Sequence, residues 1–178
     1  MQLPYLSLIG KFGASRIPYG ELLQTQEWFE KREKIIKRDD YFCEKCGFSG
    51  TVYHEGQHIT FDKKKKIDIT INGERILADY PSQSDKPIYL HVHHKFYFID
   101  KLPWEYEDDA LVTLCNWCHW EIHQNEKIPI YRQVNDKTEE LKYVPCNRCN
   151  GAGVFPEYKH IENGVCFRCN GMKYEELI

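Results

Sequence analysis

The pattern of apolar and polar positions divides the chain into a helical part, a strand-rich part and a cysteine-rich end. Between Glu21 and about Lys37 apolar residues recur at approximately helical spacing among charged ones, without Pro or Gly, which predicts one amphipathic helix. Residues 1–20 carry two Pro and three Gly and are predicted to form an irregular leader.

Residues 48–90 alternate apolar and polar in short runs, which predicts a β-rich insert. The expected strands are Ile59 to Phe61, Ile67 to Ile71, Arg75 to Tyr80 and Ile88 to Val92. Asn72-Gly73 is a strong hairpin signal between two of them. The run Lys63 to Lys66 is interpreted as a solvated hairpin tip, with a phosphate contact as the alternative.

The composition predicts a folded chain without a general attraction for nucleic acid. Its 178 residues, 42% apolar and 14% aromatic, are enough for one main unit and a small satellite. The 24 basic and 27 acidic side chains give a formal charge of −3, so any contact with DNA must come from local patches or a metal. No stretch approaches the roughly 18 apolar residues of a membrane span, and Leu3 to Gly10 lacks the flanks of a signal peptide. A cytoplasmic protein without a membrane partner is expected.

All eight cysteines fall in C-x-x-C pairs. The pairs are Cys43/Cys46, Cys115/Cys118, Cys146/Cys149 and Cys166/Cys169. Without an export signal the thiols are expected to stay reduced, and two such turns close one tetrahedral site, so four pairs predict two structural Zn²⁺ ions. Three pairings are possible, and the entropy of loop closure favours joining the last two pairs, which leaves the first two together. A thioredoxin-like redox pair is the alternative, although no pair sits in a βαβ pattern.

Five of the eight histidines fall within 33 residues of each other. His119 and His123 are four apart in a predicted helix, so both imidazoles project from one face and can bind one cation. Cys118 directly precedes His119, so a zinc knuckle would anchor the start of that helix. His93 and His94 are adjacent at the end of an apolar strand. Strict alternation turns these two to opposite faces, so a site that includes both needs a bend there.

From the helix before Cys43 to His123 the sequence resembles the HNH endonucleases, the ββα-metal group of nucleases. The resemblance rests on Cys43-x-x-Cys46, Val92-His93-His94 and Leu114-Cys-x-x-Cys118-His119-x-x-x-His123. It implies an α+β fold in which a β-hairpin carries the histidine pair, a helix carries the last histidines, and a Cys₄ zinc site braces the two. The nuclease domain would span residues 21–140, with the insert inside it.

The resemblance implies a role for each of four histidines. His94 resembles the general base, and His93, His119 and His123 resemble ligands of one catalytic divalent ion, either Mg²⁺, Mn²⁺, Ni²⁺ or Zn²⁺. The implied activity is hydrolysis of phosphodiester bonds in DNA, with double-stranded DNA as the expected partner, leaving 5′-phosphate and 3′-hydroxyl ends. A neutral histidine with a pKa of about 6.5 can accept the proton of water at physiological pH. Nothing in the sequence selects among restriction, phage packaging, mobility and defence, or fixes an oligomeric state.

The sequence departs from the family pattern at one position. The middle Asn of the HNH motif falls near Ala110, which has no polar side chain to brace the loop that orients the base, and Asp108 or Asp109 is the expected substitute. His91 is expected to face solvent or to pack, with support of a metal ligand as the alternative. Three cations are weak candidates for phosphate contacts, and a solvated surface charge is the preferred interpretation of each. These are Lys95, Lys101 and Arg132.

Residues 141–178 resemble the C-x-x-C-x-G-x-G repeat of J-protein chaperones, reduced to one zinc unit and similar to a zinc ribbon. The second half has Lys173 after Met172, where the repeat ends in Gly. A module of this length cannot hold much apolar core, so zinc is expected to contribute most of its folding energy. The expected role of the module is to place the substrate or a protein partner.

Two functions of other classes compete with the nuclease. The first is a catalytically silent zinc protein that binds nucleic acid or a protein partner, with vestigial histidines. The second is a zinc-dependent co-chaperone, suggested by the C-terminal repeat alone, since the chain contains no His-Pro-Asp tripeptide of a J domain. The four histidines favour the nuclease, because a pure binding module needs no open metal position beside a closed Cys₄ site.

Overall fold

The computed structural model describes residues 2–13, 17–134, 136–155, 158 and 160–178, and its architecture is α+β, as predicted. The helices are α1 (Tyr5–Phe12), α2 (Tyr19–Leu22), α3 (Gln26–Arg38) and α4 (Asn116–Asn125), with 3₁₀ turns η1 (Asp108–Ala110), η3 (Glu162–Gly164) and η4 (Glu175–Leu177). The strands are β1 (Val52–His54), β2 (Gln57–Ile71), β3 (Glu74–Ser84), β4 (Leu90–His94), β5 (Tyr97–Phe98), β6 (Leu111–Cys115) and β7 (Ile130–Tyr131). In the described ranges no helix combines the length and apolarity needed to cross a bilayer.

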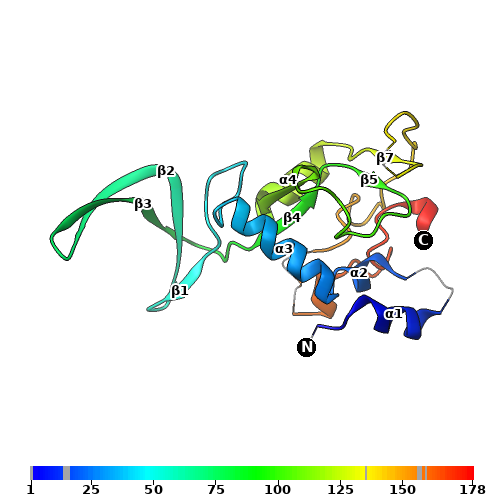
Figure 1. Cartoon of the computed structure of the whole chain (residues 1–178), viewed down its shortest axis with the longest axis horizontal. Helices are drawn as coiled ribbons and strands as arrows, with labels where there is room; N and C mark the ends of the chain where they lie inside the picture. Colours follow the sequence, from blue (N-terminus) through cyan, green and yellow to red (C-terminus); the bar gives the residue numbers. More distant parts are fainter. Residues whose placement is uncertain (1, 14–16, 135, 156–157, 159) are drawn as a thin grey trace.

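In the part of the chain that the structure describes, the strands form three sheets (Figure 1). Strands β4 and β6 pair antiparallel, with His93 opposite Val112, and α4 follows β6 directly. Strands β5 and β7 form a short parallel pair. Strands β1, β2 and β3 form an arm that projects away from the rest of the molecule. The β4, β6 and α4 elements therefore form a ββα unit.

The N-terminal segment is helical where an irregular leader was expected. Helix α1 occupies eight residues of it, and Leu8 is buried. Pro4 immediately precedes the helix and Gly13, at φ 62°, ends it. Two of the residues that suggested an irregular segment, Pro4 and Gly13, therefore mark the ends of a short helix.

The predicted amphipathic helix begins five residues later than expected. Helix α3 starts at Gln26 because Thr25 caps it: the Thr25 hydroxyl accepts a hydrogen bond from the Trp28 amide at 3.3 Å. Residues 19–22 form the separate short helix α2. The apolar spacing continued across this break, so periodicity alone could not locate it.

The arm confirms the predicted hairpin and corrects the predicted tip. Asn72 and Gly73 connect β2 to β3 with φ values of 52° and 83°. Residues Lys63 to Lys66 lie inside β2 rather than at a hairpin tip, because the residues on both sides of them pair with β3. The register shifts between Asp62 and Lys66, so the lysines lie at a bulge.

Helix α3 packs its apolar face against the β4–β6 pair. Trp28, Ile35 and Ile36 are buried against Val92 and Leu111. This apolar contact fixes the position and orientation of α3 relative to β4, the strand that carries the histidine pair.

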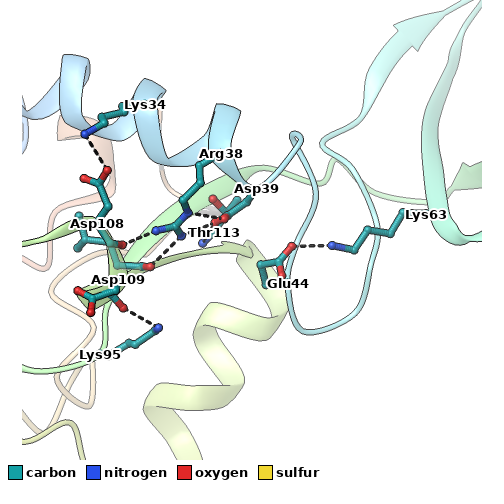
Figure 2. A network of polar contacts seen from close by, with 10 residues as sticks. Lys34, Arg38, Asp39, Glu44, Lys63, Lys95, Asp108, Asp109 and Thr113 are labelled. Carbon is teal, nitrogen blue, oxygen red and sulfur yellow. Dashed lines mark hydrogen bonds and ion pairs between the residues drawn. The ribbon is translucent and has the colours of Figure 1, made fainter.

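A polar network on the same helix ties it to β6 and η1 (Figure 2). The Arg38 guanidinium donates to the Leu111 carbonyl at 2.9 Å and to Asp39 at 2.7 Å. The Asp39 carboxylate accepts from the Thr113 amide at 2.9 Å. Lys34 lies 2.7 Å from the Asp108 carboxylate. The end of α3 is therefore joined to the strand that leads into α4.

The C-terminal segment packs against the start of the chain, as Figure 1 shows. The Tyr19 amide lies 3.4 Å from the Met172 sulfur. Gly171 comes so close to Gly20 that a Cβ on Gly171 would lie 2.6 Å from the Gly20 nitrogen. At φ +77°, Gly171 also has a backbone conformation that side chains disfavour. The two ends of the chain thus share one interface.

Candidate metal centre

The first cysteine cluster, Cys43, Cys46, Cys115 and Cys118, joins two distant parts of the chain. Its four sulfur atoms lie within 4.8 Å of one another, and the Cys46 and Cys115 sulfurs are 3.8 Å apart. A tetrahedral ion with bonds of about 2.3 Å separates its sulfur ligands by about 3.8 Å, so the spacing is suitable for zinc. The Cys118 amide also donates to the Cys115 sulfur at 3.4 Å, which places the cluster at the N-terminus of α4.

The second cysteine cluster, Cys146, Cys149, Cys166 and Cys169, has the same geometry. Its sulfur atoms also lie within 4.8 Å of one another, with 3.7 Å between Cys149 and Cys169. The turns after the knuckles use positive φ at Gly151 and Gly171. The pairing predicted from loop-closure entropy is therefore confirmed, and both clusters could hold structural zinc.

A third group contains three of the four predicted histidines. One ring nitrogen each of His93, His119 and His123 lies within 4.8 Å of the others, and all three side chains are buried. Strand β4 supplies His93, and α4 supplies the other two from one helical face. Ring centroids are 5.1 Å apart for His93 and His123 and 4.8 Å apart for His119 and His123. The ββα unit thus brings three imidazole rings close enough together to bind one ion.

The histidine group has the chemistry of a metal site. His93 Nδ1 and His123 Nε2 are buried and have no hydrogen-bond partner among the described residues. An unpartnered buried nitrogen costs free energy unless a ligand or ion satisfies it. Burial, followed by the charge of Lys173, lowers the pKa of His93 to about 3. Burial likewise lowers the pKa of His123 to about 2. The rings are therefore neutral at pH 7, with lone pairs available to a cation.

His94 lies apart from this group, because the alternation of β4 continues through its last residue. The His94 ring stacks on Trp28 at 5.2 Å between centroids and meets Tyr106 edge-on at 4.6 Å. Its Nε2 is 3.0 Å from the Pro103 carbonyl oxygen. Burial is the largest effect that lowers the pKa of His94 to about 3. The structure therefore brings three histidines together and turns the fourth toward α3.

Ala110, where the resemblance places the middle Asn, makes a main-chain contact. The Ala110 carbonyl accepts a hydrogen bond of 2.9 Å from the Lys95 amide, directly after the histidine pair. Asp108 binds Lys31 and Lys34 of α3, each at 2.7 Å, and the Asp109 carbonyl binds the Lys95 ammonium at 2.7 Å. Neither aspartate side chain takes the expected place beside His94 in the described contacts.

The remaining candidates of the sequence have structural partners. The His91 ring stacks on His119 at 5.4 Å between centroids, a contact that fits both the expected packing role and the alternative of supporting a metal ligand. Lys101 lies over the Phe98 ring at 5.4 Å, and Arg132 pairs with Glu139 at 2.7 Å.

One buried cation near the site was not expected from the sequence. Lys173 is 7% exposed and hydrogen-bonds the Tyr97 hydroxyl, and the Tyr97 ring lies 5.3 Å from that of His94. Burial lowers the pKa of Lys173 to about 7, although the charges of Cys149 and Cys169 act in the opposite direction. The sequence feature that could have drawn attention to Lys173 is that it stands where the repeat ends in Gly. Lys173 retains the backbone of a glycine there, at φ 73°.

The C-terminal segment also reaches the end of α4. The Asn150 amide donates to the His123 carbonyl, and a Cβ on Gly151 would lie 3.8 Å from His123 Nδ1. A cavity of about 210 Å³ opens there, lined by both of these residues and by residues 123–128. The second cysteine cluster is therefore attached to the helix that carries two of the three histidines.

The chain was compared with protein-family models, with curated proteins and with solved structures. No family model, no curated protein and no solved structure matches the chain.

Proposed function

We propose that the chain is a metal-dependent DNA endonuclease of the HNH type, with a divalent ion held by His93, His119 and His123. The observation that carries the proposal is the convergence of three neutral, buried imidazoles, two of them with unpartnered nitrogens, within a ββα unit. The first cysteine cluster supports it, because it anchors the helix that presents two of the ligands. Three protein ligands leave a coordination position open for water or substrate, as in catalytic sites.

Phosphodiester hydrolysis requires a nucleophile and stabilisation of negative charge. A divalent ion in this position supplies Lewis-acid stabilisation of the phosphate and of the leaving oxygen. The three histidines hold the site in one geometry, because β4 and α4 are braced on both sides by apolar packing and by the cysteine cluster. The products expected from this reaction are 5′-phosphate and 3′-hydroxyl ends.

His94 is the proposed general base. A carbonyl oxygen only accepts hydrogen bonds, so the contact with Pro103 requires the hydrogen on His94 Nε2 and leaves the lone pair on Nδ1. This is the tautomer that can take a proton from water at Nδ1. The stacking on Trp28 fixes the plane of the ring. Because the ring is 3% exposed, water must reach Nδ1 through a rearrangement of the surrounding aromatic side chains.

A catalytically silent zinc protein is the second candidate, and burial is the observation that favours it. All four histidines are between 3% and 8% exposed. A group closed in this way can serve as a structural metal site that binds nothing further. The two functions differ in one measurable respect, which is turnover of DNA.

The deciding experiment is a screen of divalent ions on supercoiled plasmid DNA. The wild-type protein should nick it with an added ion and stop when EDTA is added. His119→Ala should lose cleavage, because it removes a ligand of the ion. His94→Ala should lose about 10²–10⁴-fold in rate while it keeps the zinc of both cysteine clusters. His54→Ala is the matched control, since the His54 side chain is 75% exposed on the arm.

The outcomes separate the hypotheses. If His94→Ala cleaves DNA at the normal rate, His94 is not the general base. The assignment of the metal site would not be affected by that result. Absence of cleavage by the folded, metal-loaded wild-type protein with every ion would favour the silent zinc protein. Equal loss in the His54→Ala control would show that the effect is not specific to the site.

A further inference from the structure

A cavity of about 430 Å³ lies where the N-terminal helices, β5, β7 and the C-terminal segment meet. It is separate from the histidine group, and its volume lies in the range of ligand sites, about 300–1,000 Å³. Most of its wall is apolar, contributed by Ile9, Leu22, Ile99, Ile130, Met172 and Leu177. The polar side chains in its wall include Tyr19, Tyr97, Asp100, Lys101 and Lys173.

Lys173 places a buried ammonium group at the wall of this cavity. Its Nζ lies 4.2 Å from the centre of the Tyr19 ring and 3.9 Å from that of Tyr97, and it donates to the Tyr97 hydroxyl. Burial raises the pKa of both tyrosines well above the usual value, so both remain neutral. In the described part of the chain no carboxylate forms an ion pair with Lys173. A buried ammonium group without a carboxylate partner is costly, and an anionic ligand in the cavity would offset part of that cost.

A second donor lies on the same wall. The Tyr19 hydroxyl is buried and has no hydrogen-bond partner among the described residues. A buried hydroxyl without a partner carries a desolvation cost that a ligand's oxygen can remove. Tyr19 and Lys173 come from opposite ends of the sequence, and the close approach of Gly20 and Gly171 holds them together.

We propose that this cavity binds an organic anion with an apolar body, whose acidic head group accepts hydrogen bonds from Lys173 and Tyr19. The apolar walls take the body of the ligand, and the ammonium group selects its charge. Carboxylates, sulfonates and phosphate esters share this chemistry. The site goes beyond the proposed nuclease function and does not depend on it. The competing explanation is that Lys173 only balances the negative charge of the second cysteine cluster, whose thiolates Cys149 and Cys169 oppose the lowering of its pKa.

The test uses two fluorescent probes of one shape on the zinc-loaded full chain. The anionic probe is 1-anilinonaphthalene-8-sulfonate, and the neutral one is N-phenyl-1-naphthylamine. The wild-type protein should bind the anionic probe about tenfold more tightly than Lys173→Met does, because a charge-assisted hydrogen bond is lost. Both proteins should bind the neutral probe equally. Ile99→Trp, which fills the cavity, should remove binding of both probes.

Tyr19→Phe provides a second test of the site in case Lys173→Met loses its zinc or fails to fold. This variant removes the unpartnered hydroxyl and should weaken the anionic probe about threefold without changing the neutral one. Displacement by octanoate and by octyl phosphate, compared with octanol, distinguishes carboxylate from phosphate ligands. Equal affinity of the wild-type protein and both variants for the anionic probe would overturn the proposal and leave Lys173 as a counter-ion of the thiolates.

Discussion

The two cysteine clusters have the same ligands and very different surroundings. Around the first cluster lie buried Ile88 and Leu114 and the partly buried Phe48, Leu90 and Ile122, so its ligands belong to a mixed apolar core. Around the second cluster the buried group consists of the four cysteines and Ala152, with Phe155 at its edge. We infer that both apolar burial and zinc binding stabilise the fold around the first cluster, whereas apolar burial contributes little around the second.

The largest expected effect is the loss of the second cluster. Cys149→Ser should unfold residues 141–178, because an apparent binding free energy of about 10–16 kcal/mol for a structural zinc exceeds what so small an apolar core supplies. Limited proteolysis should cut this segment, and the zinc content should fall by one equivalent. Cys46→Ser is the counterpart. It should also cost one equivalent of zinc, but appear as a lower global melting temperature, since the first cluster joins α4 to the segment after α3. If Cys149→Ser lost both zinc ions, the clusters would not be independent.

A smaller loss of stability is expected when the polar network of Arg38, Asp39 and Thr113 is disrupted. Burial raises the pKa of Asp39, but hydrogen bonds from Arg38 and Thr113 outweigh it and lower the pKa overall. Asp39→Asn should lower the free energy of unfolding by about 1–3 kcal/mol at pH 7. Because the folded pKa lies below the unfolded one, the wild-type advantage is present above about pH 4 and is lost as the pH falls through the folded pKa. Urea unfolding at pH 7 and at low pH measures both values.

The neighbouring residue offers a control for this prediction. Asp40 is exposed, and Asp40→Asn keeps a residue type that tolerates its φ of 53°. It should change stability by no more than about 0.5 kcal/mol. A difference between the two variants that does not shrink at acid pH would contradict the assignment of the effect to the Asp39 carboxylate.

The smallest effect is expected in the arm, which has neither a cysteine cluster nor a buried core at its far end. Ile69 faces Ile76 across β2 and β3, and Ile76 is 44% exposed. Ile76→Thr should therefore change the free energy of unfolding of the whole protein by less than about 1 kcal/mol. Thermal unfolding of this variant beside Cys46→Ser and Cys149→Ser would rank the arm and the two clusters. A loss above about 2 kcal/mol would mean that the arm has a packing partner in solution.

The sequence predicted the features that depend on local chemistry. The C-x-x-C spacing and the cost of loop closure led to the correct pairing of the two clusters. The i, i+4 spacing of His119 and His123 correctly placed both rings on one face, and Asn72-Gly73 correctly marked the hairpin. In the helix and the hairpin a few neighbouring residues determine the geometry, whereas the pairing of the clusters followed from the lengths of the loops between them.

Three features were not predicted from the sequence, and one of them depends on packing between distant segments. The start of α3 is set by the Thr25 cap inside an apolar pattern that continued through it. The direction of His94 follows from strand alternation, whereas a site shared by four imidazoles required a bend that β4 does not make. The burial of Lys173 depends on Tyr19 and Tyr97, and no periodicity relates residues so far apart in the sequence.

The contact between Gly20 and Gly171 has a consequence for synthesis on the ribosome. Chains emerge from the N-terminus at about 5–20 residues per second, so α1 and α2 are exposed long before residues 171–174 exist. Helix α2 is thus made long before its C-terminal partner exists. We expect nascent chains stopped before residue 171 to leave the side of Tyr19 that faces Lys173 open to solvent, even when the contact of Tyr19 with Tyr97 has formed.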